Sequence, residues 1–352
     1  MRRFLSLLAH EFKLARTTIP IHAVAILEPV ILYALLTAIL VHPSLDVYIT
    51  NPTTEIGRSL VTAMQSIGSP IGQTYINPIL TDKTEPDGLR QVITVEEING
   101  ITTAVQKYNL IDSNLVKNYR NRLTAAALKL WNENLGNAGV EVVQEPSLPF
   151  DIPYTVYFGM AMLPLAAMLS ASMIGAILIA QEFELQTIDE YRVAPIPTWM
   201  VLSARLVRLV LSAAIAAGLL LVVNGLINSY WPDSIGMVAL ILLPIAIIGS
   251  CLGMIIGLQT RTTLPAFILT LATSITFWII GDSFKPAALF GGFYQFASYL
   301  APNSYAVNLL FPYYYGSQIN PPPLSMIVLV GLSLVMLLVV TILYTQRVSK
   351  PE

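Results

Sequence analysis

The residues best suited to chemistry lie in the stretch QEFELQTIDEYRVAPIP, residues 181–197, which begins where a long apolar run stops. Glu182 and Glu184 stand two residues apart, and Asp189 and Glu190 follow in a short segment that two prolines close. Carboxylates here can fix the end of a membrane span, because each charge at the bilayer centre costs about 2.5 to 3.5 kcal/mol. They can also bind basic residues of a partner. We expect both roles; the plainer alternative is a solvated loop whose charges only stop the span.

Other catalytic or metal-binding patterns are missing from the sequence. The single cysteine, Cys251, lies in an apolar segment, and the three histidines are scattered rather than clustered. The loop GSPIGQT, residues 68–74, resembles a phosphate loop but is one residue too short and has Gln73 in place of the lysine. We therefore expect no catalytic residues, no metal and no cofactor in this chain, and any ATP to be bound by another chain.

The composition is that of an integral membrane protein, with 55% hydrophobic and only 11% charged residues. The net charge of −2 and the lack of long charge runs argue against nucleic acid as a partner. A membrane-spanning helix needs about 20 mostly apolar residues. Six segments meet this criterion: residues 19–41, 154–180, 206–227, 235–258, 264–280 and 324–344.

An even number of spans places both termini on the same side, and the basic residues indicate which side. The flanks on that side carry Arg2, Arg3, Lys13, Arg16, Arg192, Arg205, Arg208, Arg261, Arg347 and Lys350. On the other side, residues 228–234 have no Lys or Arg and residues 282–323 have only Lys285. The positive-inside rule predicts a multi-pass protein of the cell membrane (inner or plasma membrane), with both termini cytoplasmic and residues 346–352 as a tail. Residues 1–18 read as an amphipathic helix in the membrane interface.

Residues 42–153 differ in composition from the rest and contain no run that could cross a bilayer. We expect a small mixed α/β domain outside the cell membrane. The predicted elements are strands at 45–50, 73–77 and 140–143, a helix at 53–67, and a long helix capped by Asp112 and ending near Gly136.

The 181–197 stretch resembles the signature loop of permease subunits of type-2 ABC exporters, in the subgroup with an extracytoplasmic domain after the first span. In that family the pattern is roughly E-x-E-x-G-T, then an acidic residue, a proline, and a basic residue opening the third span. The matching positions here are Glu182, Glu184, Thr187, Glu190, Pro195 and Arg205. Gln186 replaces the usual glycine, which predicts a helical rather than loosely hinged turn after Glu184.

The resemblance covers nearly the whole chain, including DVYITNPTTEIGRSLVTAM and YLAPNSYAVNLL (residues 299–310). It implies a non-catalytic permease subunit of an ATP-driven exporter that moves an amphipathic, drug-like or lipid-like substrate outward. It also implies a dimer of two permease subunits, identical or paralogous, in contact with membrane lipid. Each would bind a cytoplasmic ATP-binding subunit that holds ATP and Mg.

The resemblance further implies a coupling helix at residues 187–195, within the five-helix region 154–345. The residues that would couple to the ATPase are Glu182, Glu184, Thr187, Asp189, Glu190 and Pro195. Residues 286–316 would form a re-entrant hairpin dipping from the outer face. Asp282, Tyr299 and Tyr305 are its candidate gate residues, and an interfacial aromatic belt is the plainer role for the tyrosines.

Two polar residues fall within spans. Glu28, followed by Pro29, either lines the substrate pathway or braces a kink, and Asn224 is a weaker candidate of the same kind. A secondary transporter would predict broken spans repeated in two halves, and a membrane-embedded enzyme would need a nucleophile and base or a metal cluster. These two classes, or a scaffold without an ATPase, remain the alternatives.

Overall fold

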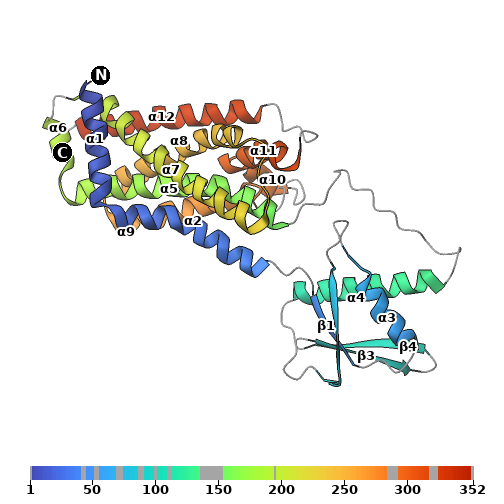
Figure 1. Ribbon diagram of the computed structural model, residues 1–352. Helices are drawn as coiled ribbons and strands as arrows, with labels where there is room; N and C mark the ends of the chain where they lie inside the picture. Colours follow the sequence, from blue (N-terminus) through green and yellow to red (C-terminus); the bar gives the residue numbers. More distant parts are fainter. Residues whose placement is uncertain are drawn as a thin grey trace. The chain divides into compact units, whose positions relative to one another are not determined.

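The computed structural model describes residues 2–40, 45–50, 55–68, 74–85, 91–98, 101–108, 113–134, 154–193, 196–283, 292–316 and 324–349. The chain divides into two compact units (Figure 1). A helical unit comprises Met1–Leu40 and Ile152–Glu352, and a smaller unit comprises Val41–Asp151. The domain boundaries expected from the sequence lie close by, at residues 42 and 153. Pro195, Lys285, Asp112 and the strand expected at 140–143 lie outside the described residues.

Among the described residues, six helices are long and apolar enough to cross a membrane, which confirms the prediction of an α-helical, multi-pass membrane protein. They are α2 (Ile19–Leu40), α5 (Tyr154–Glu184), α7 (Thr198–Asn228), α8 (Ile235–Thr260), α9 (Thr263–Ile280) and α12 (Ser325–Ser349). Helices α5 and α7 have 31 residues each. At 1.5 Å per residue each is about 46 Å long, more than the roughly 30 Å of hydrocarbon. Their charged ends can therefore extend past the apolar layer.

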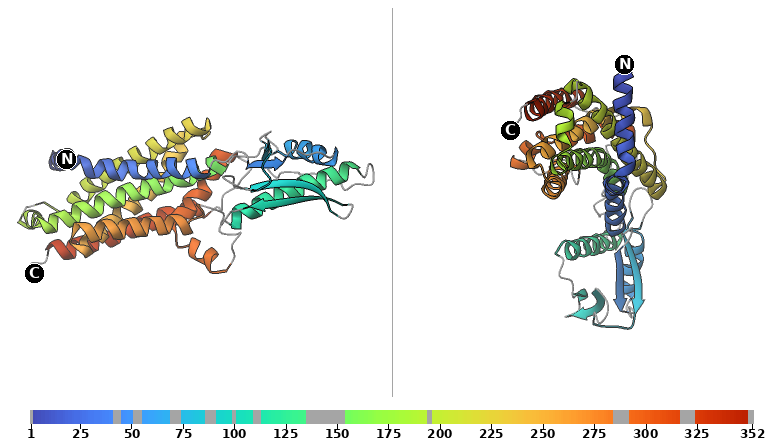
Figure 2. Two further views of the ribbon diagram at one scale, coloured as in Figure 1. Left: turned by 90° about the horizontal axis from the view of Figure 1, so that it is seen from below. Right: turned by 90° about the vertical axis from the view of Figure 1, so that its left-hand side faces the viewer.

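Helix α5 is the centre of the helical unit. Of its most apolar window 94% is buried, against 17% for α12. It packs against α2, α7, α8 and α9, and Figure 2 shows these helices lying side by side. Because lipid can also cover an apolar helix, we attribute this central place to small residues such as Ala166, Ala167 and Ala171, which are buried and permit close helix packing.

Three glycines of α8 bring its backbone against that of α5. A Cβ atom added at Gly249, Gly253 or Gly257 would lie 2.6, 2.1 and 2.6 Å, respectively, from a backbone carbonyl oxygen of α5. The three oxygens belong to Met168, Ser172 and Ala176. Spacing of four residues on both helices gives a continuous stripe of close backbone contact, the packing that small residues permit between membrane helices.

Four further helices complete the helical unit: α1 (Arg2–Thr17), α6 (Ile188–Val193), α10 (Gly292–Ser298) and α11 (Pro302–Tyr315). Helix α1 packs on α7 and runs across the bundle at the end where α6 also lies (Figure 1). Helix α11 lies at the opposite end and packs against α5, α8, α9 and α12. We call these the α6 end and the α11 end. The re-entrant position expected for residues 286–316 remains a prediction.

The smaller unit contains a four-stranded sheet in the order β2-β1-β3-β4. Its elements are β1 (Leu45–Thr50), α3 (Glu55–Gln65), β2 (Ile76–Thr81), β3 (Gln91–Ile98), β4 (Ile101–Tyr108) and α4 (Ser113–Asn134). Strand β1 is parallel to β2 and β3, while β3 and β4 are antiparallel. The alternate residues Val47 and Ile49 of β1 join Leu60 and Met64 of α3 and Ala126 of α4 in the core.

The sequence predicted β1, α3 and α4 but placed the second strand at 73–77 instead of 76–81. The hairpin of β3 and β4 was missed. A signal was available, because Asn99 and Gly100 separate the two strands in the sequence and Asn-Gly is the strongest two-residue hairpin sequence.

Candidate functional site

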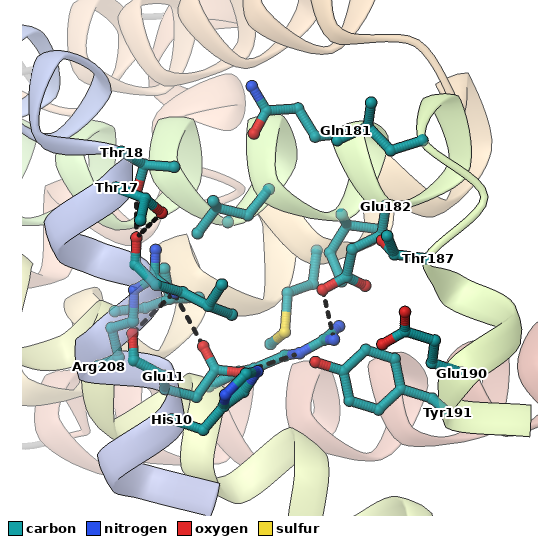
Figure 3. A pocket seen from close by; sticks show the side chains of 18 residues that line it. His10, Glu11, Thr17, Thr18, Gln181, Glu182, Thr187, Glu190, Tyr191 and Arg208 are labelled. Carbon is teal, nitrogen blue, oxygen red and sulfur yellow. Dashed lines mark hydrogen bonds and ion pairs between the residues drawn. The ribbon is translucent and has the colours of Figure 1, made fainter. Parts of the chain in front are cut away.

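Four charged side chains from three helices meet at the α6 end of the bundle; three of them are buried and Glu182 is partly buried. Arg205 of α7 binds Glu182 of α5, with 2.5 Å between Nη2 and Oε1, and its Nε lies 3.5 Å from Oε1 of Glu11 of α1. Arg208, one turn further along α7, donates from Nη1 to Oε2 of Glu11 at 2.9 Å and to its carbonyl oxygen at 3.2 Å. Residues 205 and 208 share a helix face because they are three apart. We call these four residues the charge cluster (Figure 3).

The cluster is balanced and mostly buried, with the Glu182 side chain 16% exposed. Glu11 and Arg205 are each 5% exposed and Arg208 is 2% exposed. Two carboxylates compensate two guanidinium groups, so the cluster carries no net charge. Removing one member of a buried ion pair typically costs about 3 to 5 kcal/mol, because the partner is left uncompensated in a poorly polar environment. The cluster therefore ties the ends of α1, α5 and α7 together strongly.

Two tyrosines extend the cluster to α6 and α12. The Arg205 guanidinium carbon lies 4.8 Å from the ring centroid of Tyr191 on α6 and 5.4 Å from that of Tyr344 on α12. Burial raises the pKa of Tyr191, and the nearby Arg205 charge partly opposes that shift. Ile188 of α6 is only 4% exposed. Helix α6 is thus attached to the bundle by Ile188 and Tyr191, and through Arg205 to the ends of three spans.

Glu184 connects the end of α5 to the start of α9. Its Oε1 accepts a 2.8 Å hydrogen bond from the backbone N–H of Thr263, and its Oε2 accepts one from the Thr263 hydroxyl. Thr262, the N-cap residue of α9, makes no capping hydrogen bond with its own side chain. Glu184 therefore serves as the cap from a different helix and places a negative charge at the helix N-terminus, where it is favourable.

The predicted helical turn after Glu184 is wrong. Helix α5 ends at Glu184, the next three residues form a turn, and Gln186 has φ of 59° in the left-handed region. Glycine adopts this conformation most readily, and Gln186 must adopt it because the chain reverses direction here. The coupling helix expected at 187–195 corresponds to the six residues of α6, Ile188–Val193.

The outer surface of α6 is both acidic and apolar. Asp189 and Glu190 are exposed, and so are Leu185 and Val193, at 71% and 85%. The segment 185–193 thus exposes two large apolar side chains next to two acidic ones. Thr187, another predicted coupling residue, lines a pocket of about 300 Å³ between α1, α5, α6 and α7, and Leu185 and Glu190 line it too.

Asn224 lies at the α11 end, far along α7 from the charge cluster. Its Oδ1 accepts hydrogen bonds of 2.7 Å from the Tyr33 hydroxyl and from Asn228, and Asn228 in turn accepts one from Thr155. Gly159 of α5 permits this approach, since a Cβ there would lie 2.1 Å from Asn224 Oδ1. The network links α2, α5 and α7, so Asn224 is a fully buried hydrogen-bonding bridge between spans.

Glu28 belongs neither to the charge cluster nor to the hydrogen-bond network of Asn224. It is partly buried on α2, and its Oε2 has no hydrogen-bond partner within the described part of the chain. Bracing by a bond from this oxygen to a neighbouring span is therefore not observed.

The three predicted gate residues are divided between core and surface. Asp282 is 7% exposed, has φ of 62°, and accepts hydrogen bonds from Ser304 and Asn308 of α11. Its carboxylate thus fixes α11 to the end of α9. Tyr305 donates to the Tyr299 carbonyl oxygen at 2.8 Å, and Tyr299 is 58% exposed. Tyr299 lies at the surface and Tyr305 is partly buried, and neither contacts Asp282 through any of these bonds.

Sequence reasoning did not single out Glu11, the residue that binds both arginines. A signal existed: Glu11 is the only acidic residue before Glu28, within a segment that is otherwise basic. No protein-family model matches this chain, and the search of curated proteins gave no match.

Proposed function

We propose that the chain is the permease subunit of an ATP-driven exporter of the ABC-2 type, moving an amphipathic, drug-like or lipid-like substrate out across the cell membrane. The observation that carries the proposal is the two-faced character of α6. One face is held by Ile188 and Tyr191, and the other presents Asp189, Glu190 and exposed apolar side chains. Such a helix can fit a groove in a cytoplasmic ATP-binding subunit, with its acidic residues against basic ones.

The contacts of α6 give a route for force into the membrane. A push on α6 acts through Tyr191 on Arg205, which is bonded to Glu182 at the end of α5 and to Glu11 of α1. Helix α5 is packed against four other spans, so its displacement must move its neighbours. Glu184 adds α9 through its bonds to Thr263. ATP-driven closure of two ATPase subunits would then change the packing of the bundle.

The remaining assignments follow from this orientation. The α6 end would be cytoplasmic with both termini, and the α11 end would be outside. Two permease subunits, identical or paralogous, would each bind one ATPase that holds ATP and Mg. Asp282, Tyr299 and Tyr305 would belong to an outer gate built on a re-entrant α10–α11 hairpin. Glu28 and Asn224 would both be pathway candidates, since Glu28 Oε2 and Asn224 Nδ2 have no hydrogen-bond partner within the described residues.

The proposal is tested by reversing one charge on the exposed face of α6. We expect Glu190→Lys to insert normally but to lose copurification of the cytoplasmic ATPase and at least tenfold in ATP-dependent transport. Asp233→Lys is the matched control, since Asp233 is an exposed acid in the loop at the α11 end. Binding and transport unchanged by Glu190→Lys would contradict the role of α6. Transport that continues in ATP-depleted vesicles, with no ATPase partner, would instead favour a secondary transporter.

A further inference from the structure

A groove of about 280 Å³ lies between α1, α2 and α7, and all three helices contribute side chains to it. Figure 1 shows α1 running across the bundle and continuing into α2 at the α6 end. Four apolar residues of the groove are between 41% and 60% exposed: Phe12, Ile19, Leu211 and Ile215. The groove is therefore open to the surroundings of the helical bundle, which for apolar spans are lipid.

The lining of the groove changes from charged to apolar along its length. Both α2 and α7 begin at the α6 end, and they line the groove from Ile19 to Ile26 and from Arg208 to Ile215. Seven residues of helix are about 10 Å long, roughly two thirds of the hydrocarbon thickness of one leaflet. Arg16 lies at the α6 end, whereas Ile26 and Ile215 lie at the other. A phospholipid has the same order of a charged headgroup followed by an apolar chain.

The other two basic residues of the groove already have partners. Arg208 Nη2 lies 3.4 Å from His22 Nε2, and His22 Nδ1 lies 3.0 Å from the Thr18 carbonyl oxygen. Because an arginine can only donate, Nε2 is the acceptor and Nδ1 donates to the carbonyl. The charge of Arg208 is compensated by Glu11. Neither His22 nor Arg208 thus has a free charge to offer a ligand in the groove.

Arg16 supplies the free charge of the groove. It is exposed and forms no ion pair or hydrogen bond with any described residue. Lys13 is exposed in the same way and lies three residues earlier on α1, so the two side chains are neighbours. Among the described residues that line the groove there is no aspartate or glutamate. The α6 end of the groove therefore carries two positive charges without an acid beside them.

This charge selects the kind of lipid. A guanidinium group donates two parallel hydrogen bonds to phosphate oxygens, and a second cation nearby adds to the attraction. A headgroup with its own ammonium gains less, because that ammonium is repelled by Arg16 and Lys13. A symmetric contact with a second copy of the chain is disfavoured for a related reason. It would bring the same two basic residues of both copies together.

We propose that this groove binds one phospholipid of net negative charge, with its phosphate at Arg16 and Lys13 and one acyl chain along α2 and α7. The site requires only that the bundle lies in a membrane, so it holds whatever the protein transports. A bound lipid would contact α1, α2 and α7 together. It would therefore stabilise the position of α1, which also carries Glu11 of the charge cluster.

The first test measures the choice of headgroup. The full chain is placed in nanodiscs with equal amounts of phosphatidylglycerol and phosphatidylcholine of identical acyl chains. It is then released into an uncharged detergent, and native mass spectrometry counts the retained lipids. We expect one phosphatidylglycerol per chain, preferred about fivefold over phosphatidylcholine. Arg16→Gln should reduce the preference to less than about twofold. Arg58→Gln is the control, since Arg58 is also exposed but lies in the smaller unit.

The second test blocks the apolar part of the groove and leaves both basic residues in place. Ile215→Trp fills the groove with an indole ring, and we expect it to reduce retained phosphatidylglycerol about fivefold. Leu226→Trp is the control, because Leu226 is 72% exposed on the same helix and does not line the groove. Soluble dioctanoylphosphatidylglycerol should raise Tm saturably by about 2 to 4 °C. Inorganic phosphate should not raise it.

Selective retention that is lost in both Arg16→Gln and Ile215→Trp, and kept in both controls, supports the site. The proposal is overturned if the unaltered chain retains the two lipids equally, or if either test variant behaves as the unaltered chain does. It is also overturned if inorganic phosphate stabilises as strongly as the short-chain lipid. A change in the fraction of dimers in Ile215→Trp, with lipid retention unaltered, would show instead that the groove is a contact between copies.

Discussion

Replacing Gly253 by alanine places a methyl carbon 2.1 Å from the Ser172 carbonyl oxygen, 2.6 Å from its Cα and 2.7 Å from its carbonyl carbon. All three atoms belong to the α5 backbone, so no side chain can move aside. Restoring ordinary contact requires the oxygen distance to grow from 2.1 to about 3.4 Å, which α5 and α8 can reach only by separating. Overpacking of this kind typically costs about 1 to 3 kcal/mol, and the case here lies at the upper end because backbone opposes backbone.

Alanine also favours a helix over glycine by about 1 kcal/mol, which partly offsets the clash. The control separates the two effects: at Gly218 of α7 an added Cβ meets nothing within 4 Å. We expect Gly218→Ala to be neutral or stabilising by up to about 1 kcal/mol and Gly253→Ala to be destabilising by about 1 to 2 kcal/mol net. At roughly 2 to 4 °C per kcal/mol, the two variants should differ in Tm by several degrees.

Thermal unfolding of the purified chain in detergent, followed by circular dichroism, measures the difference. Gly331→Ala is a second control, because an added Cβ at Gly331 also meets nothing within 4 Å. It shows whether the result for Gly218→Ala is specific to α7. If Gly253→Ala unfolds at or above the temperature of Gly218→Ala, the close α5–α8 contact is not present in the folded protein.

Two further substitutions test the α6 end. Arg205→Gln leaves Glu182 and Glu11 without their shared partner. We expect it to lower the free energy of unfolding by about 3 to 5 kcal/mol, seen as a large drop in Tm. A loss below about 1 kcal/mol would show that the ion pairs of Arg205 are hydrated. Gln186→Gly relieves the left-handed backbone at φ 59° and should stabilise by about 0.5 to 1 kcal/mol, because the strain removed exceeds the added freedom of the unfolded chain. A lower Tm for this variant would mean that the Gln186 side chain contributes more than its backbone conformation costs.

The spans could be predicted because long apolar runs in the sequence identify membrane helices. The residues at which the helices begin and end could not be predicted in the same way. The third span was expected to begin at residue 206, whereas α7 begins at Thr198. The expected span did not reach its first two turns, which end at Arg205. Arg205 itself is buried because α1 and α5 supply Glu11 and Glu182 as partners, and no local pattern contains that information.

The candidate site was predictable in its outward residues and not in its buried ones. Asp189 and Glu190 are exposed on a short helix, as the charge pattern indicated. Glu11 and Arg208 are 197 residues apart, so their pairing depends on the tertiary fold. The 181–197 stretch contains Gln186, but the sequence did not reveal that this position has a left-handed backbone.

The order of the charge cluster along the chain has a consequence for synthesis. Glu11 and Glu182 both precede Arg205 and Arg208, so each carboxylate already exists when α7 emerges from the ribosome. When α7 enters the bundle, the positive charges of its two arginines therefore meet carboxylates that can compensate them at once. They do not have to enter an apolar region without a partner. The two acids differ in how many residues separate them from their arginine. Glu182 and Arg205 are 23 residues apart, whereas Glu11 and Arg208 are 197 residues apart. Helix α1 can thus complete its contacts with Arg208 only after α7 has been made, so the docking of α1 on α7 follows the synthesis of α5 and α7.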